Sequence, residues 1–390
     1  MKIMIYCQHV LGVGHLFRTI EICRALAGHD IILVTGGPRI VKKLPDNVRE
    51  VRLPELQMDH HFKGLISTDP HATLDRIKEE RQVRLFALFK KEAPDLLLIE
   101  LYPFGRKAFR FELDPLLEGI KKRRLPACKV VCSVRDILVE KEKQEKHELR
   151  AVLILNDYFD AVLVHSDPNL VKIEETFLHI DEIEIPMVYS GFIAPKPEPV
   201  CRTTVRRQLG IAADDNLIIA SAGSGSVGSP LLGSAIMAFK QLRIEPSHKK
   251  MRVYTGPFMS KSDVDHLKGL AVPEIVIETF ASDFLSYLSA ADLSISMAGY
   301  NTSMDILAAK VPALVWPFSA NQEQRLRAER LAGLGALRIL DDEDIQPERM
   351  AAIIAQALAS PRCVTADVNL EGAENTAKWL ESFSRLKREG

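Results

Sequence analysis

Short, almost continuously apolar runs alternate with longer amphipathic segments along the whole chain. In the first half, runs rich in isoleucine, valine and leucine are typical of strands buried on both faces, at 3–6, 31–34, 96–99, 129–133 and 161–164. Segments with the apolar spacing of helices lie between and after them, at 16–27, 73–91, 106–124, 142–155 and 170–178. This alternation predicts a doubly wound α/β domain with a parallel sheet over residues 1–190.

The alternation resumes in the second half. Strand-like runs lie at 217–221, 252–254, 275–277, 293–296 and 313–316, and helical patterns at 230–242, 283–291, 302–310, 322–332 and 346–358. Prolines at 195, 197 and 199 mark residues 191–200 as a linker, because proline at that density extends the backbone. We therefore expect two Rossmann-like domains, 1–190 and 201–368, with a ligand cleft between them. An amphipathic helix within 369–390 is expected to pack back on the N-terminal domain.

The charge balance limits the choice of partner. The chain has 51 basic and 52 acidic residues, so we expect no nucleic-acid partner. No apolar run reaches the ~20 residues that span a bilayer, and the first strand-like run starts at once, without a signal peptide. None of the six cysteines forms a C-x-x-C pair, and together these features predict a cytoplasmic protein. Leu65-Ile66 and the basic run 121–124 are candidates for peripheral contact with the inner face of the membrane, although a solvated helix end explains the basic run more simply.

The segment Gly12-Val13-Gly14-His15 follows the first strand and opens the first helix. Glycines there let the backbone approach a ligand closely, and a helix N-terminus offers unpaired N–H groups. The helix dipole favours the neutral form of His15, which is the form that a general base needs. The alternative is a capping or packing histidine. No third glycine follows, which disfavours an NAD site, and Arg18 faces either the same ligand or solvent.

A second glycine-rich turn lies at 223–228, between a strand and a helix of the C-terminal half. Its glycines and serines predict a nest of backbone N–H groups that binds an anion. The Gly-Lys-Ser/Thr sequence of a P-loop is absent, so ATP hydrolysis is not implied. The alternative is a flexible turn. Thr255-Gly256 ends the next strand and is a candidate for a further backbone contact.

Polar residues open the last two helices of this half. Thr302 and Asp305 have the spacing of a capping box, but a carboxylate here can instead accept hydrogen bonds from ribose hydroxyls. Glu323 and Gln324 open the following helix, either to bind the hydroxyls of a sugar or as part of a solvated face.

No metal site is expected. The acidic run 341–344 reads as a surface turn without the spacing of a calcium loop. His60 and His61 are adjacent and lack a third partner, so they do not make a convincing zinc pair. We expect neither a metal ion nor another cofactor.

Together these motifs resemble family 28 glycosyltransferases of the GT-B fold. The resemblance rests on G-x-G-H after the first strand, on the Gly/Ser turn, and on A-G-x-x-T-x-x-[DE]…P…P-F…x-Q, and it is strongest over 274–336. The chain departs from the family in two places. Its first turn reads Gly-Val-Gly-His where Thr-Gly-Gly-His is more usual, and Met297 stands where an arginine precedes Ala298-Gly299.

The resemblance implies a hexosyltransferase whose C-terminal domain holds a UDP-sugar donor and whose N-terminal domain holds a small-molecule, lipid or glycan acceptor. It implies that His15 is the base, that Asp305 binds the ribose, and that Gln324, with Glu323 beside it, contacts the donor sugar. The candidate nucleotide- and phosphate-binding residues are Gly12, Gly14, Gly223, Ser224, Gly225, Ser226, Thr255, Gly256, Phe280, Gly299, Asn301, Thr302 and Asp305.

The main hypothesis is a metal-independent, inverting glycosyltransferase. The 223–228 turn would stabilise the charge that develops on the leaving diphosphate, while His15 takes the acceptor's proton. Glu100, Arg135 and Asp136 end first-domain strands and join Arg18 as acceptor-side candidates, with buried ion pairs as the alternative. Two other hypotheses stay open. One is a nucleotide-sugar hydrolase, which the G-x-G-H-x-x-R form also resembles, and the other is a non-catalytic sugar-nucleotide-binding protein.

Overall fold

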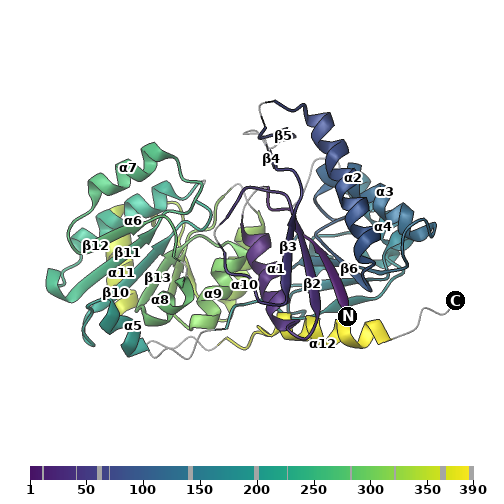
Figure 1. The fold of residues 1–390 in the computed structure, drawn as a ribbon. Helices are drawn as coiled ribbons and strands as arrows, with labels where there is room; N and C mark the ends of the chain where they lie inside the picture. The colour runs from purple at the N-terminus through teal and green to yellow at the C-terminus, as the bar shows by residue number, and fades with distance from the viewer. Residues whose placement is uncertain are drawn as a thin grey trace. The chain divides into compact units, whose positions relative to one another are not determined.

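The computed structural model describes residues 1–10, 13–40, 42–58, 64–69, 71–138, 144–196, 202–225, 227–281, 283–319, 322–360 and 366–385. The chain forms two compact units, Met1–Ile193 with Glu371–Gly390, and Ala194–Leu370 (Figure 1). The sequence had predicted a linker over 191–200 and a second domain over 201–368. No helix in these described ranges is both long and apolar enough to cross a membrane.

The first unit is built on a parallel sheet with strand order β3-β2-β1-β6-β7-β8-β9. The strands are β1 (Lys2–Tyr6), β2 (Asp30–Thr35), β3 (Val48–Arg52), β6 (Leu96–Glu100), β7 (Lys129–Arg135), β8 (Ala161–His165) and β9 (Met187–Tyr189). The central strands are apolar and buried, as the pattern predicted. The sheet grows one way through β1 and the other way from β6, so the topological switch point lies between these two strands.

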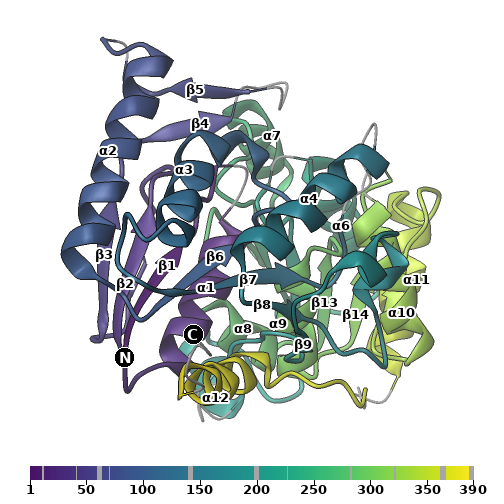
Figure 2. The same ribbon diagram turned by 90° about the vertical axis from the view of Figure 1, so that its right-hand side faces the viewer.

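Helices cover both faces of this sheet (Figure 2). One layer consists of α1 (Gly14–Ala25) and α12 (Gly372–Arg385), whose apolar side chains pack with Ile3 and Ile5 of β1. The other layer consists of α2 (Leu74–Glu92), α3 (Arg110–Lys121) and α4 (Gln144–Tyr158), which pack with Met4 and Tyr6. Alternate residues of β1 therefore belong to opposite cores, as the pleat of a strand requires.

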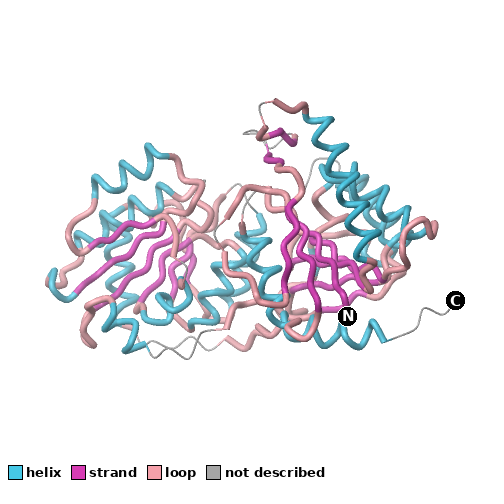
Figure 3. Tube along the Cα trace, in the orientation of Figure 1, coloured by secondary structure: helices cyan, strands magenta, loops and turns pink. Residues whose placement is uncertain are grey.

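The second unit has strand order β12-β11-β10-β13-β14-β15, and all of its pairings are parallel. The strands are β10 (Asn216–Ser221), β11 (Lys249–Tyr254), β12 (Ile275–Glu278), β13 (Leu293–Ser296), β14 (Ala313–Val315) and β15 (Arg338–Ile339). The helices are α5 (Arg202–Gln208), α6 (Ser229–Gln241), α7 (Lys261–Leu270), α8 (Phe284–Ala290), α9 (Tyr300–Ala309), α10 (Gln322–Gly333) and α11 (Pro347–Ala359). Here the switch point lies between β10 and β13. The fold class predicted from the sequence, two doubly wound Rossmann-like domains, is confirmed, and in each unit helices surround the strands (Figure 3).

Several elements differ from the prediction. Residues 170–178 form only a short 3-10 turn, η2 (Ile173–Glu175), at whose start the Glu175 carboxylate accepts from the backbone N–H of Lys172. The sequence also missed α5, α7, β15, the hairpin of β4 (Leu56–Met58) and β5 (Leu65–Ser67), and the edge strands β3 and β9. The β3 sequence, VREVR, carries three charged residues, so its apolar signal is weak.

Candidate functional site

The first cluster of polar residues lies at the switch point of the first unit. His15 is the second residue of α1, which follows β1, and Glu100 is the last residue of the neighbouring β6. His15 Nδ1 lies 2.5 Å from Glu100 Oε1. The imidazole is 17% exposed and the carboxylate only 2%. Because the ionised carboxylate only accepts, Nδ1–H is the donor, and Nε2 is left with its lone pair.

Two guanidinium groups meet the same carboxylate. Arg18 Nη2 donates to Glu100 Oε1 at 2.6 Å, and both side chains are 2% exposed. Arg106 Nε lies 3.7 Å from Glu100 Oε2. Arg18 is therefore buried against Glu100, so the solvent-facing alternative from the sequence is wrong for this residue.

These contacts fix the charge states of the pair. Burial lowers the pKa of His15 to about 3, with Arg106 and Arg18 adding to the effect and Glu100 opposing it. Burial alone would raise the pKa of Glu100, but His15, Arg18 and Arg106 outweigh it and hold that pKa well below the usual range. At neutral pH the cluster is thus a neutral imidazole on an ionised carboxylate.

Other polar residues gather at the same edge of the sheet. Arg135 is the last residue of β7, and Asp136, which follows it, is fully buried. The sequence reading missed His165, which ends β8 and is fully buried. Its Nε2 lies 2.6 Å from Ser133 Oγ and its Nδ1 lies 2.9 Å from Ser190 Oγ. Burial lowers the pKa of His165 to about 3, so it packs as a neutral histidine.

In the second unit, the predicted phosphate turn follows β10. Gly223 and Gly225 have φ of +63° and +96°, and Gly256 in the neighbouring turn has φ of +81°. A Cβ on Gly225 would lie 2.3 Å from the Thr255 carbonyl oxygen, and one on Gly256 would lie 2.4 Å from that of Gly223. The two turns pack backbone to backbone. This packing by itself explains why positions 225 and 256 are glycines, and it fixes the turn after β10. Ser226, like Gly12 in the first unit, lies outside the described residues, whereas Gly14 is the first residue of α1.

The turn after β13 lies beside it. The α9 helix begins at Tyr300 with Gly299 at its N-cap, and no side chain caps it. Thr302 is therefore the third helical residue, and the capping-box alternative for Thr302 and Asp305 is wrong. A Cβ on Gly223 would lie 3.8 Å from Thr302 Oγ1, so the turns after β10 and β13 meet at the switch point.

The other predicted residues lie in the turns that follow β10, β11, β12 and β13. Asn301 lies in the first turn of α9, and Ser224 accepts through its carbonyl from the Phe258 N–H at 2.9 Å. Thr255 is fully buried, and Phe280, after β12, is 51% exposed.

The two predicted sugar-binding residues have partners inside the protein. Glu323 is buried, and its Oε1 accepts from Arg327 Nη2 at 2.8 Å, so the solvated-face alternative is wrong for this residue. Gln324 Oε1 accepts from the backbone N–H of Phe318 at 3.1 Å. The sequence reading missed Arg327, although its spacing of four residues from Glu323 on α10 was a usable signal.

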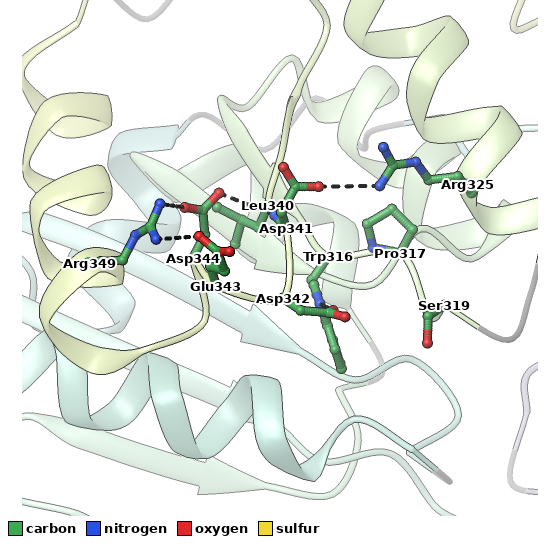
Figure 4. Close-up of a pocket in the computed structure, with 10 residues that line it drawn as sticks. All are labelled: Trp316, Pro317, Ser319, Arg325, Leu340, Asp341, Asp342, Glu343, Asp344 and Arg349. Atoms are coloured by element: carbon green, nitrogen blue, oxygen red, sulfur yellow. Dashed lines mark hydrogen bonds and ion pairs between the residues drawn. The ribbon is translucent and has the colours of Figure 1, made fainter.

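A pocket of about 650 Å³ lies in the second unit at the ends of β14 and β15 (Figure 4). It is lined by Trp316, Pro317, Ser319, Arg325, Leu340, Asp341, Asp342, Glu343, Asp344 and Arg349. Its acidic residues pair with its own walls: Arg325 with Asp341, Arg349 with Glu343 and Asp344, and the Trp316 indole with Asp342. The acidic run is a turn, as predicted, and also the wall of this pocket. Among the described residues, no group of three or more His, Cys, Asp or Glu is arranged to hold a metal ion. His60 and His61 are not among them.

Comparison with known proteins shows which family the second unit resembles. Residues 214–378 match the model of the glycosyltransferase family 28 C-terminal domain. One curated relative is the UDP-N-acetylglucosamine--N-acetylmuramyl-(pentapeptide) pyrophosphoryl-undecaprenol N-acetylglucosamine transferase of Carboxydothermus hydrogenoformans. It is 28% identical over 187 residues, which are 47% of this chain and 48% of the relative. The chain spans about half the length of the curated relatives it matches.

Solved structures of similar fold cover nearly the whole chain. The glycotransferase of kitacinnamycin has a TM-score of 0.62 at 15% identity, with 98% of each chain covered. UDP-GlcNAc 2-epimerase from Methanocaldococcus jannaschii also has a TM-score of 0.62, at 14% identity, with 98% of this chain and 100% of that one covered. At such identities the likeness shows the fold alone. Over residues 214–378 the chain resembles the C-terminal domain of glycosyltransferase family 28, and as a whole it has a fold of the GT-B class, with two Rossmann-like domains.

Proposed function

We propose that this protein is an inverting glycosyltransferase that needs no metal and moves a sugar from a UDP-sugar to a hydroxyl acceptor. The observation that carries the proposal is the His15–Glu100 pair, a neutral imidazole with a buried carboxylate on Nδ1 and a lone pair on Nε2. A base of this form suits a reaction in which a hydroxyl must lose a proton as it attacks. The family 28 domain supports the nucleotide-sugar donor.

The donor half of the proposal concerns the second unit. The first intrahelical bond of α9 runs from the Ser303 N–H to the Gly299 carbonyl, so the preceding amides point out of the helix end. A helix N-terminus stabilises the negative charge of a diphosphate, and the turn 222–225 lies beside it. We assign Asp305 to the ribose and the exposed ring of Phe280 to the side of the base.

The chemical step follows from these roles. The acceptor hydroxyl gives its proton to His15 Nε2 while its oxygen attacks the anomeric carbon. The bond from that carbon to the diphosphate oxygen breaks, and UDP leaves with the electron pair. Glu100 then faces an imidazolium, which it stabilises, as carboxylates do beside catalytic histidines. Attack opposite the leaving group inverts the anomeric configuration.

A lipid-linked or glycan acceptor completes the proposal. The name of the Carboxydothermus relative includes a pyrophosphoryl-undecaprenol acceptor. For peripheral membrane contact the first unit offers Ile66, which is 42% exposed, whereas Leu65 next to it is buried. The four residues of the basic run 121–124 are exposed at the end of α3. Cosedimentation with anionic and neutral vesicles tests this part, because electrostatic contact predicts binding to the anionic vesicles alone.

The test is turnover of UDP-sugars with and without hydroxyl acceptors, followed by release of UDP. A transferase releases UDP much faster when an acceptor is present. Release at the same rate without an acceptor would identify a hydrolase, and tight binding without any release a sensor. Absence of binding by every UDP-sugar would overturn the proposal.

A further inference from the structure

Arg327 is a buried guanidinium that ties two elements of the second unit together. It lies on α10, and its side chain has no exposed surface. Its Nη1 donates to the Ala298 carbonyl at 3.0 Å, and its Nη2 donates to Glu323 Oε1 at 2.8 Å. Its guanidinium carbon lies 5.4 Å from the centre of the Tyr300 ring. The Arg327 side chain thus contacts both the Ala298 carbonyl, just before the N-cap residue of α9, and the ring of Tyr300, the first residue of that helix.

These contacts lie at the turn that leads into the N-terminus of α9. Ala298 is in the turn from β13 to α9, next to the N-cap residue Gly299, so its carbonyl orients the peptide that leads into the helix end. Glu323 is only 4% exposed, and the pair with Arg327 spans one turn of α10. A buried ion pair is costly to break, because removing one partner leaves the other charge unpaired. The turn after β13 is therefore held by a fixed charged group and not by apolar packing alone.

The same helix also holds the segment that precedes it. Gln324 Oε1 accepts from the Phe318 N–H at 3.1 Å, in the loop after β14. Helix α10 thus contacts two loops. Gln324 binds the loop after β14, and Arg327, paired with Glu323, binds the β13–α9 turn.

We propose that Arg327, held by Glu323, is a positioning residue for the diphosphate of the nucleotide. It fixes the β13–α9 turn so that the amides at the start of α9 point at the phosphate groups. Glu323 belongs to this device and is not a sugar ligand. The inference rests on the proposed function, because it assumes that the start of α9 binds the diphosphate of UDP.

The test compares the affinities of UDP and uridine, measured by calorimetry on the full chain. The variants are R327K, R327M and E323Q, with R338M as the control. Arg338 lies on β15, does not line the pocket, and donates to Gln356 Oε1 at 2.9 Å on the surface of the same unit. We expect R327M to weaken UDP binding by about 10- to 100-fold, the range for a hydrogen bond to a charged group. Uridine affinity should stay within about twofold, as for distant, independent sites.

The variants separate positioning from simple destabilisation. R327K can keep one of the two donations, so it should recover part of the UDP affinity, and E323Q should lie between wild type and R327M. R338M should match wild type for both ligands. Equal losses of UDP and uridine, or no loss of either, overturn the inference while the proposed function stands. Failure of wild type to bind UDP at all would overturn the proposed function, and this inference with it.

Discussion

At the level of single residues, the charge states around His15 decide the chemistry. Glu100 is held ionised by three groups from α1 and the loop after β6, and His15 is held neutral although a carboxylate is bonded to it. Sequence reasoning reached His15 from its place at the start of a helix. It did not connect Glu100 to His15, because 85 residues separate them and only the pairing of β1 with β6 joins them.

Replacing Glu100 with Gln tests the pair. The amide keeps the size of the side chain but removes the charge that stabilises an imidazolium. We expect kcat to fall by roughly 10²- to 10⁴-fold, with the KM for the UDP-sugar nearly unchanged. Steady-state kinetics with varied donor measure both constants. A kcat within about threefold of wild type would remove Glu100 from the mechanism.

Replacing Arg106 with Met tests the electrostatics. A base works only when neutral, so the acidic limb of kcat/KM in wild type should follow the His15 pKa of about 3 and not the ordinary value near 6.5. Arg106 and Arg18 lower the pKa of His15, and Glu100 raises it. Loss of Arg106 should therefore move the acidic limb to higher pH. An R110M variant, which changes a half-exposed arginine paired with Asp114, should leave the profile unchanged.

Among the elements, glycine turns show where sequence patterns are informative and where they are not. The 223–228 turn was correctly located, and the strand 293–296 has the predicted bounds. The sequence showed only part of the reason for the glycines in this turn. Gly225 and Gly256 are required by each other's turn, a contact between residues 31 positions apart that no local pattern encodes. Similarly, the sequence left Glu323 either as a sugar ligand or as part of a solvated face, whereas in the structure it is buried and paired with Arg327.

Replacing Gly256 with Ala should destabilise the second unit. Its φ of +81° is unfavourable for any residue with a Cβ, and that Cβ would lie 2.4 Å from the Gly223 carbonyl oxygen. We expect the free energy of unfolding to fall by about 2 kcal/mol or more. Gly269, inside α7, has open space around its Cβ position, so G269A should instead stabilise by up to ~1 kcal/mol. Denaturant unfolding of both variants measures the contrast, and equal effects would contradict this explanation of the turn.

In the whole molecule, the first unit is completed by the C-terminal end of the described chain. Helix α12 packs on α1, and Leu380 is fully buried in the core that it shares with Ile3 and Ile5. The Gly372 N–H donates to the Phe192 carbonyl at 2.9 Å, so the two segments that border the second unit in sequence are bonded to each other. The alternation of apolar runs in the sequence predicted the parallel sheets and the helix layers. The pairing of α12 with α1 depends on residues more than 350 positions apart.

Replacing Leu380 with Ala tests this arrangement. Loss of a fully buried leucine side chain should cost about 2–5 kcal/mol. Hydrogen exchange should show weaker protection of β1 and β6 amides, with the amides of β10 and β13 nearly unchanged. L153A, which shortens a leucine that is 66% exposed on α4, should change stability by less than about 0.5 kcal/mol. Equal loss of protection in both units would show that they unfold together.

The rate of UDP release by H15A is the most direct test of His15 as the base. Its control is H179A, which removes a histidine of the same unit that pairs with Glu182 near the surface. We expect H15A to bind UDP as wild type does but to turn over roughly 10²- to 10⁴-fold more slowly, whereas H179A keeps the full rate. A rate in H15A equal to that of wild type, at saturating donor and acceptor, would contradict the assignment of His15 as the base.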